Sequence, residues 1–218
     1  MLYHEACWFG KELSKFNPKI LSPMLDIGSS TKEFRTRDQP WIDEHIFKPL
    51  RENGVEIYHL DQKHSDGVDI VGDLSDLIFI EKLSRIGIKS VFCSNVFEHV
   101  ENISELATSI NLILPKGGLI FVSCPYCYPY HPDPIDTMFR PDVIELRNLF
   151  PDAKFLRGEI VIDKTYFNQL DNSIMRLLKQ VSKLLLPFYS KDEKVMMKNY
   201  LRYSFKNFKA TCIIMEAN

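Results

Sequence analysis

The sequence lacks a long hydrophobic run and carries little net charge of either sign. None of its apolar stretches approaches the ~20 residues that cross a bilayer, so we expect no stable membrane insertion. Residues 1–15 show no basic start followed by an apolar run, so we also expect no secretory signal. The formal net charge of the 218 residues is -2, which argues against a general nucleic-acid binder and predicts no nucleic-acid partner.

Cysteine is scarce as well. The chain has five cysteines, and an odd number in a chain of this size argues against a disulfide framework. Cys93, Cys124 and Cys212 lie in apolar, strand-like runs, where cysteine behaves as a small hydrophobe. Cys124 and Cys127 have CxxC spacing, but no second CxxC or CxxH pair accompanies them, so we expect no zinc site there and no metal. This usage predicts a reducing, cytoplasmic location.

The chain does contain a regular alternation of strand-like and helix-like segments. We expect strands at 23–28, 55–61, 68–71, 90–94 and 119–124, and helices at 41–53, 75–86, 103–114 and 141–150, the last with Pro141 in its first turn. Such alternation is typical of a parallel α/β sheet. Two later strands, at 153–162 and 209–215, predict a closing antiparallel hairpin. We expect one domain over 1–218, with a cap segment at 1–20 and a helical insertion at 164–208.

Polar residues follow the expected strands where each one ends. Gly28 is the only glycine of a dinucleotide fingerprint that is present after the first strand, and Asp26 stands just before it. Asp61, Asp73 and Asn95 follow the next three strands. Because ligands of open α/β sheets bind at the carboxyl ends of the strands, this pattern predicts a nucleotide site.

Four segments in order resemble the class I S-adenosylmethionine-dependent methyltransferases: LDIGSS, DIVGDLSDL, CSNVFEHVEN and LILPKGGLIFVSCPY. The resemblance covers residues 21–163, although Ser30 and Lys32 replace the second and third glycines that are usual in the first motif. It implies a Rossmann-like, seven-stranded sheet that is mostly parallel and ends in an antiparallel hairpin. It also implies an enzyme with S-adenosylmethionine as its cofactor.

The resemblance assigns the cofactor residues one by one. Asp26 and Gly28 contact the methionine part and Ser29 lies beside them. Asp61 accepts from the ribose hydroxyls, Asp73 and Leu74 flank the adenine, and Asn95 closes the pocket.

The stretch from Gly28 to Asp61 is longer than the ~20 residues of the standard fingerprint, and the excess falls in the segment 29–40, which contains Arg35, Arg37 and Asp38. We expect an enlarged loop over the cofactor. Its charges would order the loop through Arg–carboxylate pairs, contact an anionic acceptor, or be solvated.

The segment 126–140, YCYPYHPDPIDTMFR, follows the fifth strand and resembles bacterial methyltransferases linked to glycan synthesis. Its prolines limit loop entropy and help to fix polar side chains. The expected acceptor is therefore a small polar molecule, with O-methylation of a sugar or glycan precursor first and N-methylation close behind. His131 is the best general base and His99 the second, because the histidine pKa lies near working pH. Asp136 and Asp133 would orient the base, bind sugar hydroxyls or hold a divalent cation, and the expected acceptor contacts are Tyr126, Tyr130, Asp133 and Arg140.

Several alternatives stay open. The same fold would serve a non-catalytic scaffold that binds the cofactor, whereas an NAD-dependent oxidoreductase or epimerase is disfavoured by the missing GxGxxG and Tyr-x-x-x-Lys patterns. The amphipathic segment 172–189 would form a lid, a homodimer surface, a membrane-interface contact or a helix over the sheet edge. Trp8, Phe9 and Phe16 would cap the cofactor or anchor the core.

Overall fold

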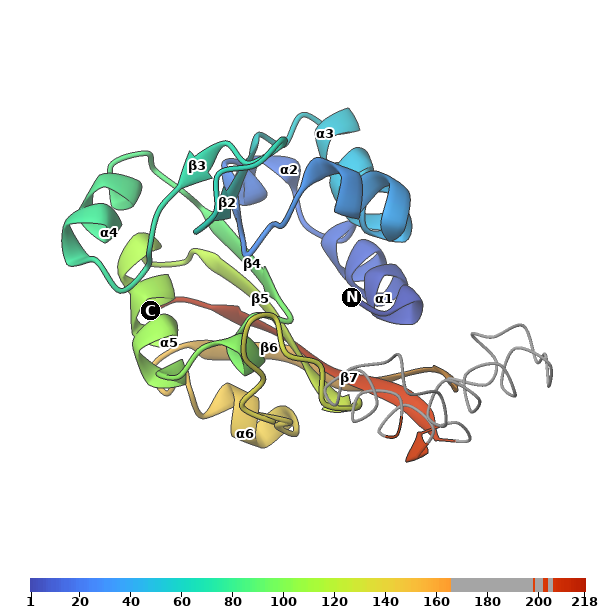
Figure 1. Ribbon diagram of the computed structural model, residues 1–218. Coiled ribbons are helices and arrows are strands. Elements are labelled where there is room, and N and C mark those ends of the chain that lie inside the picture. Colours follow the sequence, from blue (N-terminus) through green and yellow to red (C-terminus); the bar gives the residue numbers. More distant parts are fainter. Residues whose placement is uncertain (166–197, 199–201, 204–205) are drawn as a thin grey trace.

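The computed structural model describes residues 1–165, 198, 202–203 and 206–218, and these contain one seven-stranded sheet. The strand order is β3-β2-β1-β4-β5-β7-β6 (Figure 1). The strands are β1 (Met24–Ile27), β2 (Ile57–Asp61), β3 (Ile70–Val71), β4 (Ser90–Ser94), β5 (Leu119–Cys127), β6 (Lys154–Thr165) and β7 (Asn207–Glu216). Strands β1 to β5 pair in parallel, and β7 runs antiparallel to both β5 and β6. The expected fold class is therefore confirmed.

The central strands are buried on both faces, which explains why they read as continuous apolar runs. Successive side chains alternate between two cores, because neighbouring residues of a strand point to opposite faces. Val91 of β4 belongs to the core under α4 (Leu77–Ser84), α5 (Ile103–Ile113) and α6 (Val143–Arg147). Phe92 belongs to the other core, under α1 (Tyr3–Leu13), α2 (Pro18–Leu21) and α3 (Lys48–Glu52). The helices thus form two layers around the sheet (Figure 1).

Two expected helices differ from the structure. The one expected at 41–53 is divided into a π-helical turn, η2 (Asp43–Phe47), and α3. Pro49 accounts for the division, because it has no N–H to continue the first ladder but fits the first turn of a new helix. The one expected at 141–150 begins only at Val143, because Asp142 caps it by accepting hydrogen bonds from the backbone N–H groups of Ile144 and Glu145. Pro141 precedes the helix, so its predicted place in the first turn is wrong.

The N-terminal segment is part of the core. Phe9 is fully buried and meets Phe92 edge to face at 4.9 Å between ring centroids. The indole N–H of Trp8 donates to Glu159 of β6 (2.9 Å), and Phe16 packs against Phe121 of β5. For these three aromatic residues the core role is therefore the one observed.

Residues 166–197, 199–201 and 204–205, which hold the amphipathic segment 172–189 and most of the expected insertion, lie outside the described residues. Within the described ranges, no helix combines the length and the apolar character that crossing a bilayer needs. All five cysteines are free, and burial raises the pKa of the Cys93, Cys124 and Cys212 thiols.

Candidate active site

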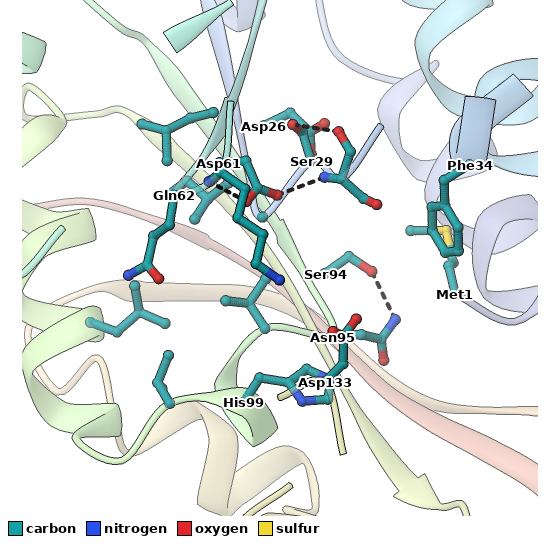
Figure 2. Close-up of a pocket in the computed structure, with 18 of the residues that line it drawn as sticks. Met1, Asp26, Ser29, Phe34, Asp61, Gln62, Ser94, Asn95, His99 and Asp133 are labelled. Carbon is teal, nitrogen blue, oxygen red and sulfur yellow. Dashed lines mark hydrogen bonds between the residues drawn. The ribbon is translucent and has the colours of Figure 1, made fainter. Parts of the chain in front are cut away.

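A cavity of about 1110 Å³ lies at the carboxyl ends of the parallel strands. Its walls include every residue expected to contact the cofactor, namely Asp26, Gly28, Ser29, Asp61, Asp73, Leu74 and Asn95. His99, His131 and Asp133 from the expected acceptor side also line it. Figure 2 shows Asp26, Ser29 and Asp61 at one end of the cavity, His99 and Asp133 at the other, and Asn95 between them.

The turn after β1 depends on Gly28. Its φ is 71°, in the left-handed region, and an added Cβ would lie 2.5 Å from Cγ2 of Val96. The backbone N–H groups of Gly28 and Ser29 both donate to the carbonyl of Leu60 in β2. Ser30 also has a positive φ, 56°, so it adopts a backbone conformation that glycine takes more easily. The turn thus keeps its shape although the motif has lost a glycine.

Asp61 joins the loops that follow β1 and β2. Its Oδ2 accepts a hydrogen bond from the N–H of Ser30 (2.9 Å), and its Oδ1 accepts one from the N–H of Lys63 (3.1 Å). These bonds fix the carboxylate at the cavity wall. A carboxylate has about four acceptor positions, so it still has room for ligand hydroxyls.

Arg35 orders the enlarged loop, which contains the π-helical turn η1 (Phe34–Asp38). The Arg35 guanidinium is buried and donates to the backbone carbonyls of Ser29 (2.7 Å), Ser30 (2.8 Å) and Gly67 (2.7 Å). Burial lowers the pKa of Arg35. Of the alternatives left open for the loop charges, Arg35 is neither solvated nor hydrogen-bonded to a carboxylate, because its guanidinium donates to three backbone carbonyls. Arg37 does pair with a carboxylate, that of Glu33, on the exposed surface of the loop.

Asp26 has a partner that the sequence analysis missed. Its Oδ2 lies 2.7 Å from Nδ1 of His59, the residue directly across from it in β2. Both side chains are largely buried, and Asp26 lines the cavity. The pair could have been found only from the register of β1 and β2, since 33 residues separate the two positions.

Glu5 of α1 is a second residue that the sequence analysis missed. Its side chain is fully buried, and Oε1 accepts hydrogen bonds from Ser123 (2.6 Å), Asn95 (2.9 Å) and Ser94 (3.2 Å). Its Oε2 accepts from the N–H of Leu2 (2.8 Å), which satisfies a free backbone donor at the start of α1. Glu5 therefore holds the side chain of Asn95, whose φ of 53° turns the chain after β4.

Asp73 and Leu74 lie at the β3 end of the cavity. The carboxylate of Asp73 accepts from the N–H of Ser75 (2.9 Å), and this bond lowers the pKa of Asp73. Leu74 is almost buried, and its carbonyl accepts from the hydroxyl of Ser109 in α5.

Two histidines form the other end of the cavity. Nδ1 of His99 lies 2.6 Å from the carbonyl oxygen of Ile135, and Nδ1 of His131 lies 3.0 Å from that of Pro129. The rings meet edge to face at 5.2 Å between centroids. Burial lowers the pKa of His131. Tyr128, which the sequence analysis did not single out, also lines the cavity, with its ring centroid 4.8 Å from that of His131.

Asp136 and Arg140 stabilise the segment 126–140 by an ion pair between them. The Asp136 carboxylate is buried, pairs with Arg140 (2.7 Å), and accepts from the N–H groups of His131 and Met138. Burial raises its pKa, but Arg140 and these N–H groups outweigh burial and lower the pKa overall. Asp136 and Arg140 are not among the described residues that line the cavity, nor are Tyr126 and Tyr130.

Glu98, from the turn η3 (Phe97–His99), is a third residue that the sequence analysis missed. Its side chain is fully buried, and neither carboxyl oxygen has a hydrogen-bond partner. Burial raises the pKa of Glu98 to about 8. Its Oε1 lies 3.7 Å from Nε2 of His99 and 3.9 Å from Nε2 of His131. The sequence signal was present, as the FEH of the post-strand-four motif, but burial of the carboxylate was not visible in it.

Comparisons with known proteins agree on the fold. No family model matches the chain, and no curated protein matches it either. Among solved structures, the MccD protein has a TM-score of 0.58 at 12% identity and covers 98% of this chain and 96% of its own. A SAM-dependent methyltransferase from Archaeoglobus fulgidus has a TM-score of 0.53 at 15% identity, covering 95% and 92%. The [4+2]-cyclase SpnF has a TM-score of 0.57 at 14% identity, covering 95% and 79%.

The strand order, the antiparallel hairpin and these similarities define a Rossmann-like α/β protein. More specifically, the chain has the fold of the class I S-adenosylmethionine-dependent methyltransferases, as its motifs predict.

Proposed function

We propose that this protein transfers a methyl group from S-adenosylmethionine to a small polar acceptor, and that the acceptor is a hydroxyl of a sugar or glycan precursor. One observation carries the proposal. Every residue that the motifs assign to the cofactor lines a single cavity at the carboxyl ends of the strands, where ligands of open α/β sheets bind.

The cavity offers a matching group for each part of the cofactor. Asp61 would accept from the ribose hydroxyls, and Asp73 and Leu74 would flank the adenine. Asp26, Gly28, Ser29 and Asn95 would receive the methionine part. Small-molecule pockets typically measure ~300–1,000 Å³, so a cavity of about 1110 Å³ leaves space for an acceptor beside the cofactor.

The chemistry asks little of the protein beyond positioning. The acceptor oxygen attacks the methyl carbon, the C–S bond breaks, and its electron pair stays on sulfur as S-adenosylhomocysteine forms. Because the sulfonium is already a good leaving group, alignment of the acceptor supplies most of the catalysis. The hydroxyl proton must also leave, and we assign its removal to the cluster of Glu98, His99 and His131 at the acceptor end. His131 is the first candidate base there, since its lowered pKa keeps the imidazole neutral at neutral pH.

Ligand binding is the first test. Calorimetric titration with S-adenosylmethionine, S-adenosylhomocysteine and NAD should show binding of the first two and not the third. Tight binding of NAD without binding of S-adenosylmethionine would contradict the proposal.

Methyl transfer is the second test. Nucleotide sugars and glycans are incubated with methyl-labelled cofactor, alongside amine acceptors as the N-methylation arm. Label in a sugar hydroxyl supports the full proposal, whereas label in an amine alone contradicts the acceptor class. Cofactor binding without transfer to any acceptor would favour the non-catalytic scaffold.

A further inference from the structure

Glu98, His99 and His131 bring three ligand atoms together at the acceptor end of the cavity. A carboxylate oxygen and two imidazole nitrogens of these residues all lie within 4.8 Å of one another. Glu98 is fully buried, and both of its oxygens lack a hydrogen-bond partner. Buried polar atoms are almost always satisfied, so an unsatisfied carboxylate calls for a missing partner. We infer that these three residues form a binding site for one divalent transition-metal ion of the zinc type.

The backbone contacts of the two histidines orient their free nitrogens toward Glu98. A carbonyl oxygen only accepts hydrogen bonds, so the contacts with Ile135 (2.6 Å) and Pro129 (3.0 Å) place the ring proton of each histidine on Nδ1. Nε2 of His99 and of His131 therefore carries a lone pair. Metal-binding histidines commonly donate their other N–H to a backbone carbonyl in this way.

When Glu98 is ionised, three electron-pair donors thus face one another with no hydrogen-bond donor between them. A proton on Glu98 would satisfy one of the two Nε2 atoms and leave the other without a partner. A cation satisfies all three ligands at once.

The separations are close to those that a metal needs. A tetrahedral zinc ion has ligands at ~2.0–2.2 Å, which places them roughly 3.4 Å apart. The Glu98 oxygen lies 3.7 Å from His99 Nε2 and 3.9 Å from His131 Nε2, and the three ligand atoms all lie within 4.8 Å of one another, so the side chains would have to draw closer around a bound ion. Two imidazoles and one carboxylate suit zinc, iron or cobalt better than magnesium, which prefers oxygen ligands alone.

The site would be open toward the acceptor. His99 and His131 lie on the cavity wall, while Glu98 lies behind them in the protein. Three protein ligands with a vacant fourth position are the pattern of catalytic rather than structural zinc sites. An acceptor hydroxyl in that position would lose its proton more readily, because a bound metal lowers its pKa. The ion would occupy the lone pair that a general base requires, so in the metal-bound protein His131 would not accept the proton, and the proton of the bound hydroxyl would pass to water in the open cavity. This consequence for the acceptor rests on the proposed function, whereas metal binding itself does not.

Metal titration tests the site directly on the full chain. Protein stripped with a chelator is titrated with Zn²⁺ by calorimetry and with Co²⁺ by visible absorption, with Mg²⁺ for comparison. We expect one Zn²⁺ per chain, the absorption of tetrahedral Co²⁺, and no thiolate-to-cobalt charge-transfer band. Glu98→Gln and His131→Ala should each weaken binding at least ~100-fold, since loss of an outer partner alone costs 10- to 100-fold. His4→Ala is the matched control, because His4 pairs with Asp163 outside the cluster. This variant should bind Zn²⁺ as tightly as the unaltered chain does.

Three outcomes would overturn the site: no stoichiometric binding of Zn²⁺ or Co²⁺, an affinity in Glu98→Gln and His131→Ala equal to that of the unaltered chain, or a cobalt spectrum with sulfur ligands. The cobalt spectrum of the unaltered chain decides the matter even if a variant misfolds. Titration of the same samples with S-adenosylmethionine separates the two proposals. Cofactor binding without metal binding contradicts only the metal site, and metal binding without cofactor binding contradicts only the proposed function.

Discussion

Replacing Gly28 with alanine should damage the cofactor turn for two separable reasons. The first is its φ of 71°, since a left-handed backbone costs an L-residue ~1–2 kcal/mol. The second is contact, because the new Cβ would lie 2.5 Å from Cγ2 of Val96. Overpacking of this kind costs ~1–3 kcal/mol, so we expect Gly28→Ala to lower the free energy of unfolding by about 2–5 kcal/mol.

Gly54 provides the matched control. Its φ is 80°, but an added Cβ would meet nothing within 4 Å. Gly54→Ala should therefore show only the backbone cost of ~1–2 kcal/mol. Both substitutions stiffen the unfolded chain alike, so the difference between them isolates the contact with Val96.

Urea unfolding followed by circular dichroism measures both variants, and calorimetry measures their affinity for S-adenosylmethionine. Gly28→Ala should bind the cofactor more weakly, whereas Gly54→Ala should bind it as the unaltered chain does. Adding Val96→Ala to Gly28→Ala removes the clashing methyl group and should cost less than the two changes summed. Two results together would refute the close contact: equal free energies of unfolding for Gly28→Ala and Gly54→Ala, and a loss of stability in the Gly28→Ala/Val96→Ala variant equal to the sum of the two single losses.

The remaining predictions concern charged residues in the cavity wall and around it. Asp61→Ala should weaken S-adenosylmethionine binding by ~1.5–3 kcal/mol, or about 10- to 150-fold by calorimetry, and unchanged affinity in a folded variant would exclude a ribose contact. Arg35→Ala leaves three backbone carbonyls without their donor and should lower the free energy of unfolding in urea by ~1.5–3 kcal/mol. Arg37→Ala, on the exposed surface, should change it by less than ~0.5 kcal/mol, and equal effects would contradict the role of Arg35. Glu5→Ala should lower both the melting temperature and cofactor affinity, because the Asn95 amide loses one of its two acceptors; unchanged affinity would show that Glu5 only anchors α1.

The sheet could be predicted from the sequence because its signals are local. Strand β4 was expected at the residues where it lies, since SVFCS is a short apolar run between turn signals. The predicted helix boundaries were wrong where a single side chain determines where a helix begins or ends. Asp142 moves the start of α6 past Pro141, and Pro49 divides the helix expected at 41–53.

For a related reason, the sequence could predict that the residues assigned to the cofactor would meet at one cavity. In a parallel sheet the residues after each strand meet at one edge, so Asp61 and Asn95 could be placed from the strand order alone. The hydrogen-bond partners that other helices and strands contribute to the site could not be predicted in this way. Glu5 reaches Ser123 across 118 residues of sequence, and His59 pairs with Asp26 only through strand register.

The short stretch after β4 connects the two ends of the cavity. Asn95 is held by Glu5, and the Val96 side chain packs where a Cβ on Gly28 would lie. Glu98 and His99 follow at once, in the turn η3, and face His131 at the acceptor end. Because the chain here is a tight turn rather than a flexible loop, the distance between the cofactor turn and the histidine cluster is set by these few residues. Under the proposed function, the motif that reads as a cofactor signature in the sequence would therefore also fix where the acceptor sits relative to the methyl group, and a methyl transfer that relies on alignment would need that fixed distance.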